Sequence, residues 1–172
     1  MQAFLLSRID YERMTIPKEA EYFKLERMRD FLRRLGNPQD RLSILHIAGT
    51  KGKGSTAAMA ASMLREAGRK TGLFTSPHLH QIEERIVADG RMIPSEEFER
   101  ILSQMRPVIE EVDALDRERP LPIGGPTFFE IINAAALVWF AEQKLDSAVI
   151  EVGLGGRLDS TNVCNPKATV IT

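Results

Sequence analysis

The chain has 172 residues, 43% of them hydrophobic and 27% charged, so it can bury one hydrophobic core and a single domain is expected. A formal net charge of −1, with no basic stripe, argues against a nucleic-acid-binding surface. The single cysteine, Cys164, excludes an internal disulfide, and neither a signal-peptide core nor an apolar span of membrane length is present, so a soluble cytoplasmic protein is expected.

Two helical segments are predicted before the first strand. Residues 4–11 mix apolar and charged side chains, which is typical of a solvated helix end. A longer helix is predicted to open at Thr15 and Pro17, to present one broad apolar face, and to end at Gly36 and Pro38.

Residues 42–67 predict a buried strand, a glycine-rich turn and a helix. The apolar run 44–48 precedes the turn, and the helical pattern 57–67 follows it until Gly68. Free backbone N–H groups and a helix N-terminus favour an anion, and Lys53 would add a full positive charge. We therefore predict a phosphate-binding turn, formed by Gly49, Thr50, Lys51, Gly52, Lys53, Gly54 and Ser55.

This turn departs from the strict P-loop pattern. Ile47 stands where the first glycine belongs, and Gly54 stands where a serine or threonine would bind magnesium. Any metal ion held here would need oxygen ligands from elsewhere in the chain. The alternative is a strand-to-helix turn without a ligand, although Lys53 has no packing reason to lie in one.

The middle of the chain predicts a strand, a hairpin, a helix and a loop. Their ranges are 71–74 for the strand, 85–93 for the hairpin around Asp89 and Gly90, 95–112 for the helix, and 113–126 for the loop. We expect Ser95 to cap the helix and Pro107 to kink or break it.

The last part of the chain predicts a buried helix followed by two strands. Thr127 and Glu130 have capping-box spacing, and residues 128–140 are apolar nearly all round. A strand over 148–152 contains Glu151 and runs into the glycine-rich loop 153–159, and a further strand begins at Ala168.

Strands separated by helices predict an α/β fold with a doubly wound, mostly parallel sheet, in which ligands bind outside the carboxyl ends of the strands. The phosphate-binding turn, Ser76 and Glu151 all fall at such ends. Burying a carboxylate is costly unless it is paired or binds a metal, and Mg²⁺ takes one or two protein oxygens besides phosphate and water. We predict Ser76 and Glu151 as magnesium ligands, with pairing of Glu151 to Arg157 or Lys53 as the alternative.

A series of sequence blocks follows one order along the chain: HIAGTKGKGS at 46–55, TSPHL at 75–79, EERI at 83–86, TFFE at 127–130, and IEVGLGGRLDSTN at 150–162. With these blocks the chain resembles the dihydrofolate synthase/folylpolyglutamate synthase family of the Mur ligase superfamily. The resemblance implies a P-loop NTPase-like fold of the Mur ligase central-domain type. It also implies an ATP-dependent folate-pathway ligase that joins L-glutamate to dihydropteroate or a folate through an acyl phosphate.

The resemblance also implies roles for particular residues. The turn would bind ATP, with Lys53 on the outer phosphate oxygens as the catalytic residue, while Ser76 and Glu151 would bind Mg²⁺. The segments expected to contact the pterin or folate are Thr127, Phe128, Phe129 and Glu130, together with Leu158, Asp159 and Ser160. Capping alone also explains Thr127 and Glu130, core packing explains the phenylalanines, and an Asx turn explains Asp159.

The family continues past the length of this chain with a C-terminal glutamate-ligase domain. Residues 1–172 are therefore expected to be an incomplete N-terminal ATP-binding domain that is inactive alone and exposes a sheet edge. A non-catalytic nucleotide- or pterin-binding module and a sister amino-acid ligase of the Mur type are the alternatives.

Overall fold

The computed structural model describes residues 2–10, 25–117 and 125–172. Its helices are α1 (Gln2–Leu6), α2 (Leu25–Arg34), α3 (Lys53–Glu66), α4 (Ser95–Arg117) and α5 (Phe128–Glu142), with short 3₁₀ turns η2 (Pro38–Arg41), η3 (Ile82–Arg85) and η4 (Ser160–Val163). Its strands are β1 (Ile44–Ala48), β2 (Thr71–Phe74), β3 (Ile86–Ala88), β4 (Arg91–Met92), β5 (Ser147–Glu151) and β6 (Ala168–Ile171). Thr15 and Pro17, where the first long helix was expected to open, lie outside the described residues.

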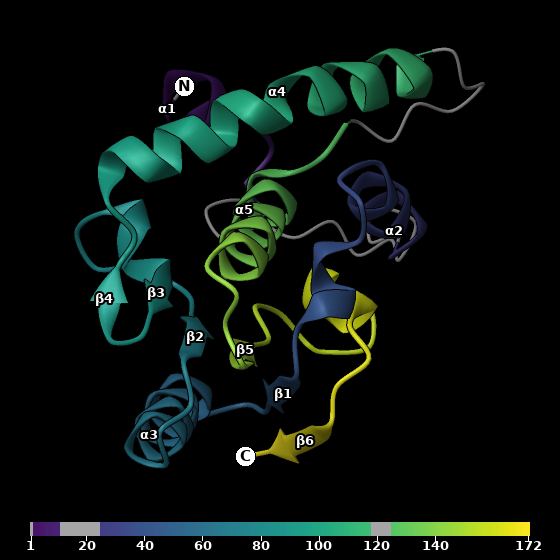
Figure 1. The fold of residues 1–172 in the computed structure, drawn as a ribbon. Helices are drawn as coiled ribbons and strands as arrows, with labels where there is room; N and C mark the ends of the chain where they lie inside the picture. Colours follow the sequence, from purple (N-terminus) through teal and green to yellow (C-terminus); the bar gives the residue numbers. More distant parts are fainter. Residues whose placement is uncertain (1, 11–24, 118–124) are drawn as a thin grey trace.

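The six strands form one sheet in the order β4-β3-β2-β5-β1-β6. β2, β5, β1 and β6 are parallel, and the β3–β4 hairpin adds two antiparallel strands at one edge. α3 covers one face, whereas α5 lies on the other face with α4 packed over it (Figure 1). The prediction of an α/β fold with a mostly parallel sheet is confirmed, and so is the hairpin at Asp89 and Gly90, both of which have positive φ.

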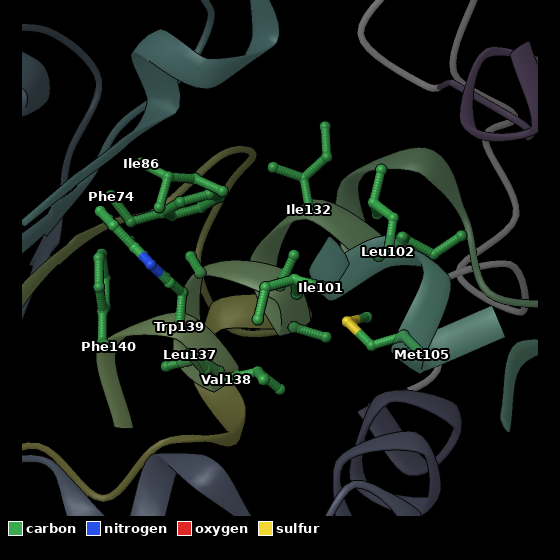
Figure 2. Close-up of a cluster of buried hydrophobic side chains, with 14 of the residues drawn as sticks. Phe74, Ile86, Ile101, Leu102, Met105, Ile132, Leu137, Val138, Trp139 and Phe140 are labelled. Atoms are coloured by element: carbon green, nitrogen blue, oxygen red, sulfur yellow. The ribbon is translucent and has the colours of Figure 1, made fainter. Parts of the chain in front are cut away.

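α5 is the centre of the larger hydrophobic core, as its sequence predicts. Its N-terminus carries the predicted capping box, because Glu130 N donates to Thr127 Oγ1 and Thr127 N donates to Glu130 Oε2. Apolar side chains around the helix meet β2, β3 and α4 (Figure 2). The core residues labelled there are Phe74, Ile86, Ile101, Leu102, Met105, Ile132, Leu137, Val138, Trp139 and Phe140.

β6 lies at the edge of the sheet and contrasts with β2, β5 and β1 because all four of its residues are exposed. Ile171 is 81% exposed, and among the described elements only β1 pairs with β6. The expected exposed sheet edge is therefore present on this side of the molecule (Figure 1).

The N-terminal segment differs from its expected solvated state. Leu5 in α1 is fully buried, and the carbonyl of Ile9 accepts a hydrogen bond from Phe128 N at 3.0 Å. Arg8 donates to both carboxylate oxygens of Asp113, at 2.8 and 2.7 Å. A stretch this short has no periodicity that reveals a docking partner, so its burial depends on α4 and α5.

α4 also corrects three expectations. Ser95 is its first residue rather than its cap, and the Ser95 hydroxyl donates to Glu83 Oε1 at 2.9 Å. The helix continues without a break through Pro107 and ends at Arg117, inside the expected loop. A proline inside a helix costs about 3 kcal/mol, and burying one Leu, Ile or Met gains about 1.5–3 kcal/mol. The buried side chains of Met105 and Ile109, on either side of Pro107, therefore offset its cost.

Candidate functional site

The phosphate-binding turn joins β1 to α3 at the carboxyl edge of the sheet. Gly52 has φ +75 and precedes α3, which begins at Lys53 rather than after the turn as expected. The Thr56 N–H bonds the Gly52 carbonyl at 2.9 Å, so the N–H groups of Lys53, Gly54 and Ser55 precede the helix's own hydrogen-bond ladder. Such free donors at a helix N-terminus form an anion site.

Thr172 braces the turn, which the sequence did not predict. Its N–H donates to the Ala48 carbonyl at 2.9 Å, and its hydroxyl donates to the Lys51 carbonyl at 2.6 Å. A Cβ at Gly49, where φ is +145, would lie 2.2 Å from Thr172 Oγ1. Gly49 is therefore required by both its conformation and the close approach of Thr172.

Glu151, at the end of β5, lies beside this turn. It is buried, and its Oε2 accepts a hydrogen bond from Ser76 N, after β2, at 3.0 Å. Burial raises the pKa of the Glu151 carboxyl, while the Ser76 N–H and the positive charge of Lys53 oppose that rise. The structure thus brings together the three predicted places, although they lie far apart in the sequence.

Gly54 explains how the turn departs from the P-loop pattern. A Cβ at Gly54 would lie 3.4 and 3.5 Å from the two carboxylate oxygens of Glu151. The Glu151 carboxylate therefore lies against the space that a P-loop serine or threonine side chain would enter. Arg157 is exposed, and among the described residues neither it nor Lys53 forms an ion pair with Glu151.

The donor set suits magnesium better than a metal held by protein alone. The described residues contain no group of three or more His, Cys, Asp or Glu side chains that could hold a metal ion. Mg²⁺ typically takes one or two protein oxygens and completes its shell with phosphate and water. One buried carboxylate beside an anion-binding turn fits that requirement.

The predicted pterin-contacting residues of the first segment divide by exposure. Phe128 is buried in the core, whereas Phe129 is half-buried, its ring centroid 5.7 Å from that of Phe74. A Cβ at Gly153 would lie 2.5 Å from the Phe129 ring, so the ring packs directly on the loop after β5. Phe129 alone of the two aromatic rings reaches the surface at this edge.

Thr127 and Glu130 are buried and serve the helix that they begin. Besides capping α5, Glu130 forms a buried ion pair with Arg27 of α2, with Nε and Oε2 3.0 Å apart. These contacts match the structural alternative for both residues, since their polar atoms face the protein interior.

The second predicted segment divides in the same way. Leu158 is exposed, whereas Ser160 and Asp159 are buried. Asp159 Oδ1 accepts a hydrogen bond from Thr161 N at 2.9 Å, which is the Asx-type arrangement, and its Oδ2 accepts one from Leu154 N at 2.7 Å. Burial raises the pKa of the Asp159 carboxyl, and the hydrogen bonds from Thr161 and Leu154 oppose that rise.

Residues of the EERI block, to which the sequence analysis assigned no role, hold the loop after β2. Glu84 accepts hydrogen bonds from three consecutive backbone N–H groups, those of Leu79, His80 and Gln81, at 2.7, 2.9 and 3.0 Å. Arg85 Nε donates to His78 Nδ1 at 2.8 Å. The loop that carries Ser76 is therefore held by the EERI block, a role that no periodicity or motif spacing signals.

Two other features bear on function. Burial raises the pKa of the Cys164 thiol to about 12, so this cysteine is a poor nucleophile at neutral pH. No helix in the described part of the chain is long and apolar enough to cross a membrane.

Comparison with known proteins finds relatives that are similar in sequence and in fold. The chain is 46% identical over 149 residues to the dihydrofolate synthase/folylpolyglutamate synthase of Bacillus subtilis, a match that covers 86% of this chain. Its fold matches a Mycobacterium tuberculosis folylpolyglutamate synthase (FPGS) complexed with ADP, with a TM-score of 0.85 and 34% identity over 99% of this chain. It also matches an FPGS complex with AMPPCP and folate, with a TM-score of 0.83 and 34% identity over 99% of this chain. No family model matches the chain.

The matches are partial on the side of the relatives. The chain spans 33% of the Bacillus protein, 35% of the Mycobacterium chain and 38% of the chain crystallised with folate.

Proposed function

We propose that this chain, which is similar to members of the dihydrofolate synthase/folylpolyglutamate synthase family, forms the ATP- and magnesium-binding portion of such a ligase. The reaction would join L-glutamate to dihydropteroate or to a folate, through an acyl phosphate made from ATP. One observation carries the proposal: Glu151 accepts the Ser76 N–H and lies against Gly54 of the turn that contains Lys53, at the carboxyl edge of a mostly parallel sheet.

The turn and the two predicted magnesium ligands have separate roles in this proposal. The N–H groups of residues 49–55 bind the triphosphate, and the Lys53 ammonium neutralises charge on its outer oxygens during transfer. Ser76 and Glu151 hold Mg²⁺, which when bound supplies charge neutralisation and orientation to the phosphates. The ADP and AMPPCP bound to the matched FPGS structures support a nucleotide at this site.

The acid substrate would lie beside the loop after β5. Phe129 offers a flat, half-exposed ring there, and Leu154 and Leu158 are exposed apolar side chains on the same loop. A pterin ring needs such an apolar face, and the folate in one matched complex supports this class of substrate. The buried Asp159, Ser160, Thr127, Phe128 and Glu130 would shape this surface from beneath.

Residues 1–172 would form the N-terminal domain of the ligase and require a further domain for glutamate. This fits a chain that spans 33% of the Bacillus subtilis relative. The proposal therefore predicts nucleotide binding by the chain and no glutamate-dependent ADP release from it alone. We further propose a cytoplasmic location for the protein.

Calorimetric titration with AMPPCP, with and without Mg²⁺, tests the nucleotide site. Lys53→Gln should weaken AMPPCP binding about tenfold in both conditions, because it removes the positive charge at the outer phosphates. Glu151→Gln should abolish only the enhancement by Mg²⁺. The control Lys70→Gln, an exposed lysine just before β2 at the opposite edge of the sheet, should bind as wild type.

Retention of wild-type AMPPCP affinity by Lys53→Gln would overturn the phosphate site. Retention of the Mg²⁺ enhancement by Glu151→Gln would overturn the metal site alone. Glutamate-dependent ADP release by the unmodified chain would contradict the need for a further domain.

A further inference from the structure

A cluster of buried polar side chains lies beneath the loop after β5. Its members are His46 in the middle of β1, Asn133 in α5, Asp159 at the end of the loop, and Ser160 and Thr161 in η4. Thr161 is fully buried. Burying polar groups is costly unless they are hydrogen-bonded, so the side chains of this cluster need hydrogen-bond partners inside the protein.

Thr161 is the centre of these bonds. Its hydroxyl donates to Asp159 Oδ1 at 2.5 Å and lies 2.8 Å from His46 Nε2. A hydroxyl has one proton to donate, so with that proton on Asp159 the second contact requires His46 to donate from Nε2. Burial lowers the pKa of the His46 imidazole, which favours this neutral form. The result is a directional chain from His46 through Thr161 to Asp159.

These hydrogen bonds link the loop 153–159 to the sheet. Asp159 also closes the loop by accepting from Leu154 N, while the bond from Asn162 Nδ2 to the Arg157 carbonyl stays within the same segment. The His46 bond crosses 115 residues of sequence, to the strand that leads directly into the phosphate-binding turn.

A second hydrogen bond, between α5 and η4, is weaker. Asn133 Nδ2 donates to Ser160 Oγ at 3.3 Å, and Asn133 Oδ1 is buried with no partner in the described part of the chain. The shorter bonds, and the carboxylate that accepts one of them, make Thr161 the stronger attachment.

We propose that Thr161 is a positioning residue, which holds the loop 153–159 at a fixed place relative to β1 and thereby forms the surface that receives the acid substrate. The link between this loop and the acid substrate rests on the proposed function, whereas the positioning of the loop by Thr161 does not. In this proposal the Thr161 hydroxyl holds the Asp159 carboxylate, which in turn holds the Leu154 backbone. Asp159 then affects substrate binding through the position of Leu154.

The test compares Thr161→Val, which keeps the shape and removes the hydroxyl, with Thr161→Ser, which restores the hydroxyl. Thr71→Val is the matched control: Thr71 is also buried and its hydroxyl lies 3.0 Å from Ser147 Oγ, at the amino end of the sheet. Amide hydrogen exchange at Leu154, the ¹⁵N signals of the His46 ring, and calorimetric binding of pteroate and of Mg²⁺–AMPPCP are measured for each.

Thr161→Val should speed Leu154 exchange at least about tenfold, beyond any change in global protection, and should shift the His46 Nε2 signal. It should weaken pteroate binding about tenfold and leave nucleotide binding within about twofold. Thr161→Ser should restore all of these, and Thr71→Val should change none.

Unchanged Leu154 exchange in Thr161→Val, or an equal change in Thr71→Val, would overturn the positioning role. Faster exchange with unchanged pteroate affinity would overturn its link to substrate. Absence of pteroate binding by wild type would instead count against the proposed substrate, while exchange and the histidine signals still decide the role of Thr161.

Discussion

Two loops at the carboxyl edge of the sheet are each closed by a single carboxylate that accepts backbone N–H groups. After β2, Glu84 accepts from three consecutive N–H groups, those of residues 79–81. After β5, Asp159 accepts from Leu154 N and Thr161 N, and also from the Thr161 hydroxyl. The chemistry of closure is the same in both loops.

The two carboxylates differ in their surroundings. Glu84 is half-buried, in a loop made by neighbours in sequence, whereas Asp159 is 6% exposed and is hydrogen-bonded through Thr161 to a distant strand. An exposed carboxylate that loses a partner regains water, but a buried one that loses a partner remains unsatisfied. Loss of a hydrogen-bond partner should therefore destabilise the loop after β5 more than the loop after β2.

The largest effect should come from Asp159→Ala. This change leaves the buried N–H and hydroxyl of Thr161 and the part-buried N–H of Leu154 without their acceptor, so we expect a loss of about 3–5 kcal/mol in the free energy of unfolding. Urea denaturation measures it. Asp146→Ala is the control, because Asp146 is exposed and its carboxylate accepts one hydrogen bond within the described residues, from the Lys70 N–H at 2.9 Å; it should cost about 1 kcal/mol. Equal losses in the two variants would break the comparison.

A smaller effect should come from Gly153→Ala in the same loop. The new Cβ would lie 2.5 Å from the Phe129 ring, and the displaced ring should cost about 1–3 kcal/mol. Adding Phe129→Ala should remove that penalty, and a double-mutant cycle by urea denaturation measures the coupling between the two sites. A penalty that persists without the ring would show that the loop backbone itself, and not the ring, is the constraint.

The smallest effect should come from Glu84→Gln, and it should depend on pH. The Leu79 N–H, followed by the Gln81 N–H, holds the pKa of the Glu84 carboxyl below its ordinary value of 4.5. Because the folded-state pKa is lowered, this carboxylate stabilises the fold fully above the ordinary pKa and loses that contribution as pH falls through the lowered value. The gap in unfolding free energy between wild type and Glu84→Gln should therefore narrow below pH 4.5.

Urea denaturation at a series of pH values measures that gap. Glu66→Gln, which changes an exposed carboxylate at the end of α3, is the control and should show no such narrowing. A gap for Glu84→Gln that stays constant with pH would mean that its carboxylate does not close the loop.

Parts of the fold that depend on near neighbours were predictable from the residues. The hairpin at Asp89 and Gly90 follows from a turn that requires positive φ, and the start of α5 follows from the Thr127–Glu130 capping box. The strands of the parallel sheet follow from short apolar runs between helical patterns. The meeting of Glu151 with the phosphate-binding turn was also expected, since the carboxyl ends of parallel strands share one edge.

Other features depended on partners that no local pattern names. Leu5 is buried by α4 and α5, and α4 passes through Pro107 because its apolar side is covered. The split between Phe128 in the core and Phe129 at the surface was not readable from two adjacent phenylalanines, since which of them is buried depends on how α5 sits on the sheet.

The sequence by itself therefore determined most of the elements, the mostly parallel sheet and the position of the glycine-rich turn, because turn geometry, capping and apolar periodicity act over a few residues. Only the tertiary structure decided which polar groups are buried together, as His46 and Thr161 are across 115 residues. The physical reason is that a buried hydrogen bond is specified by its desolvation and its geometry, and both exist only after the chain has packed.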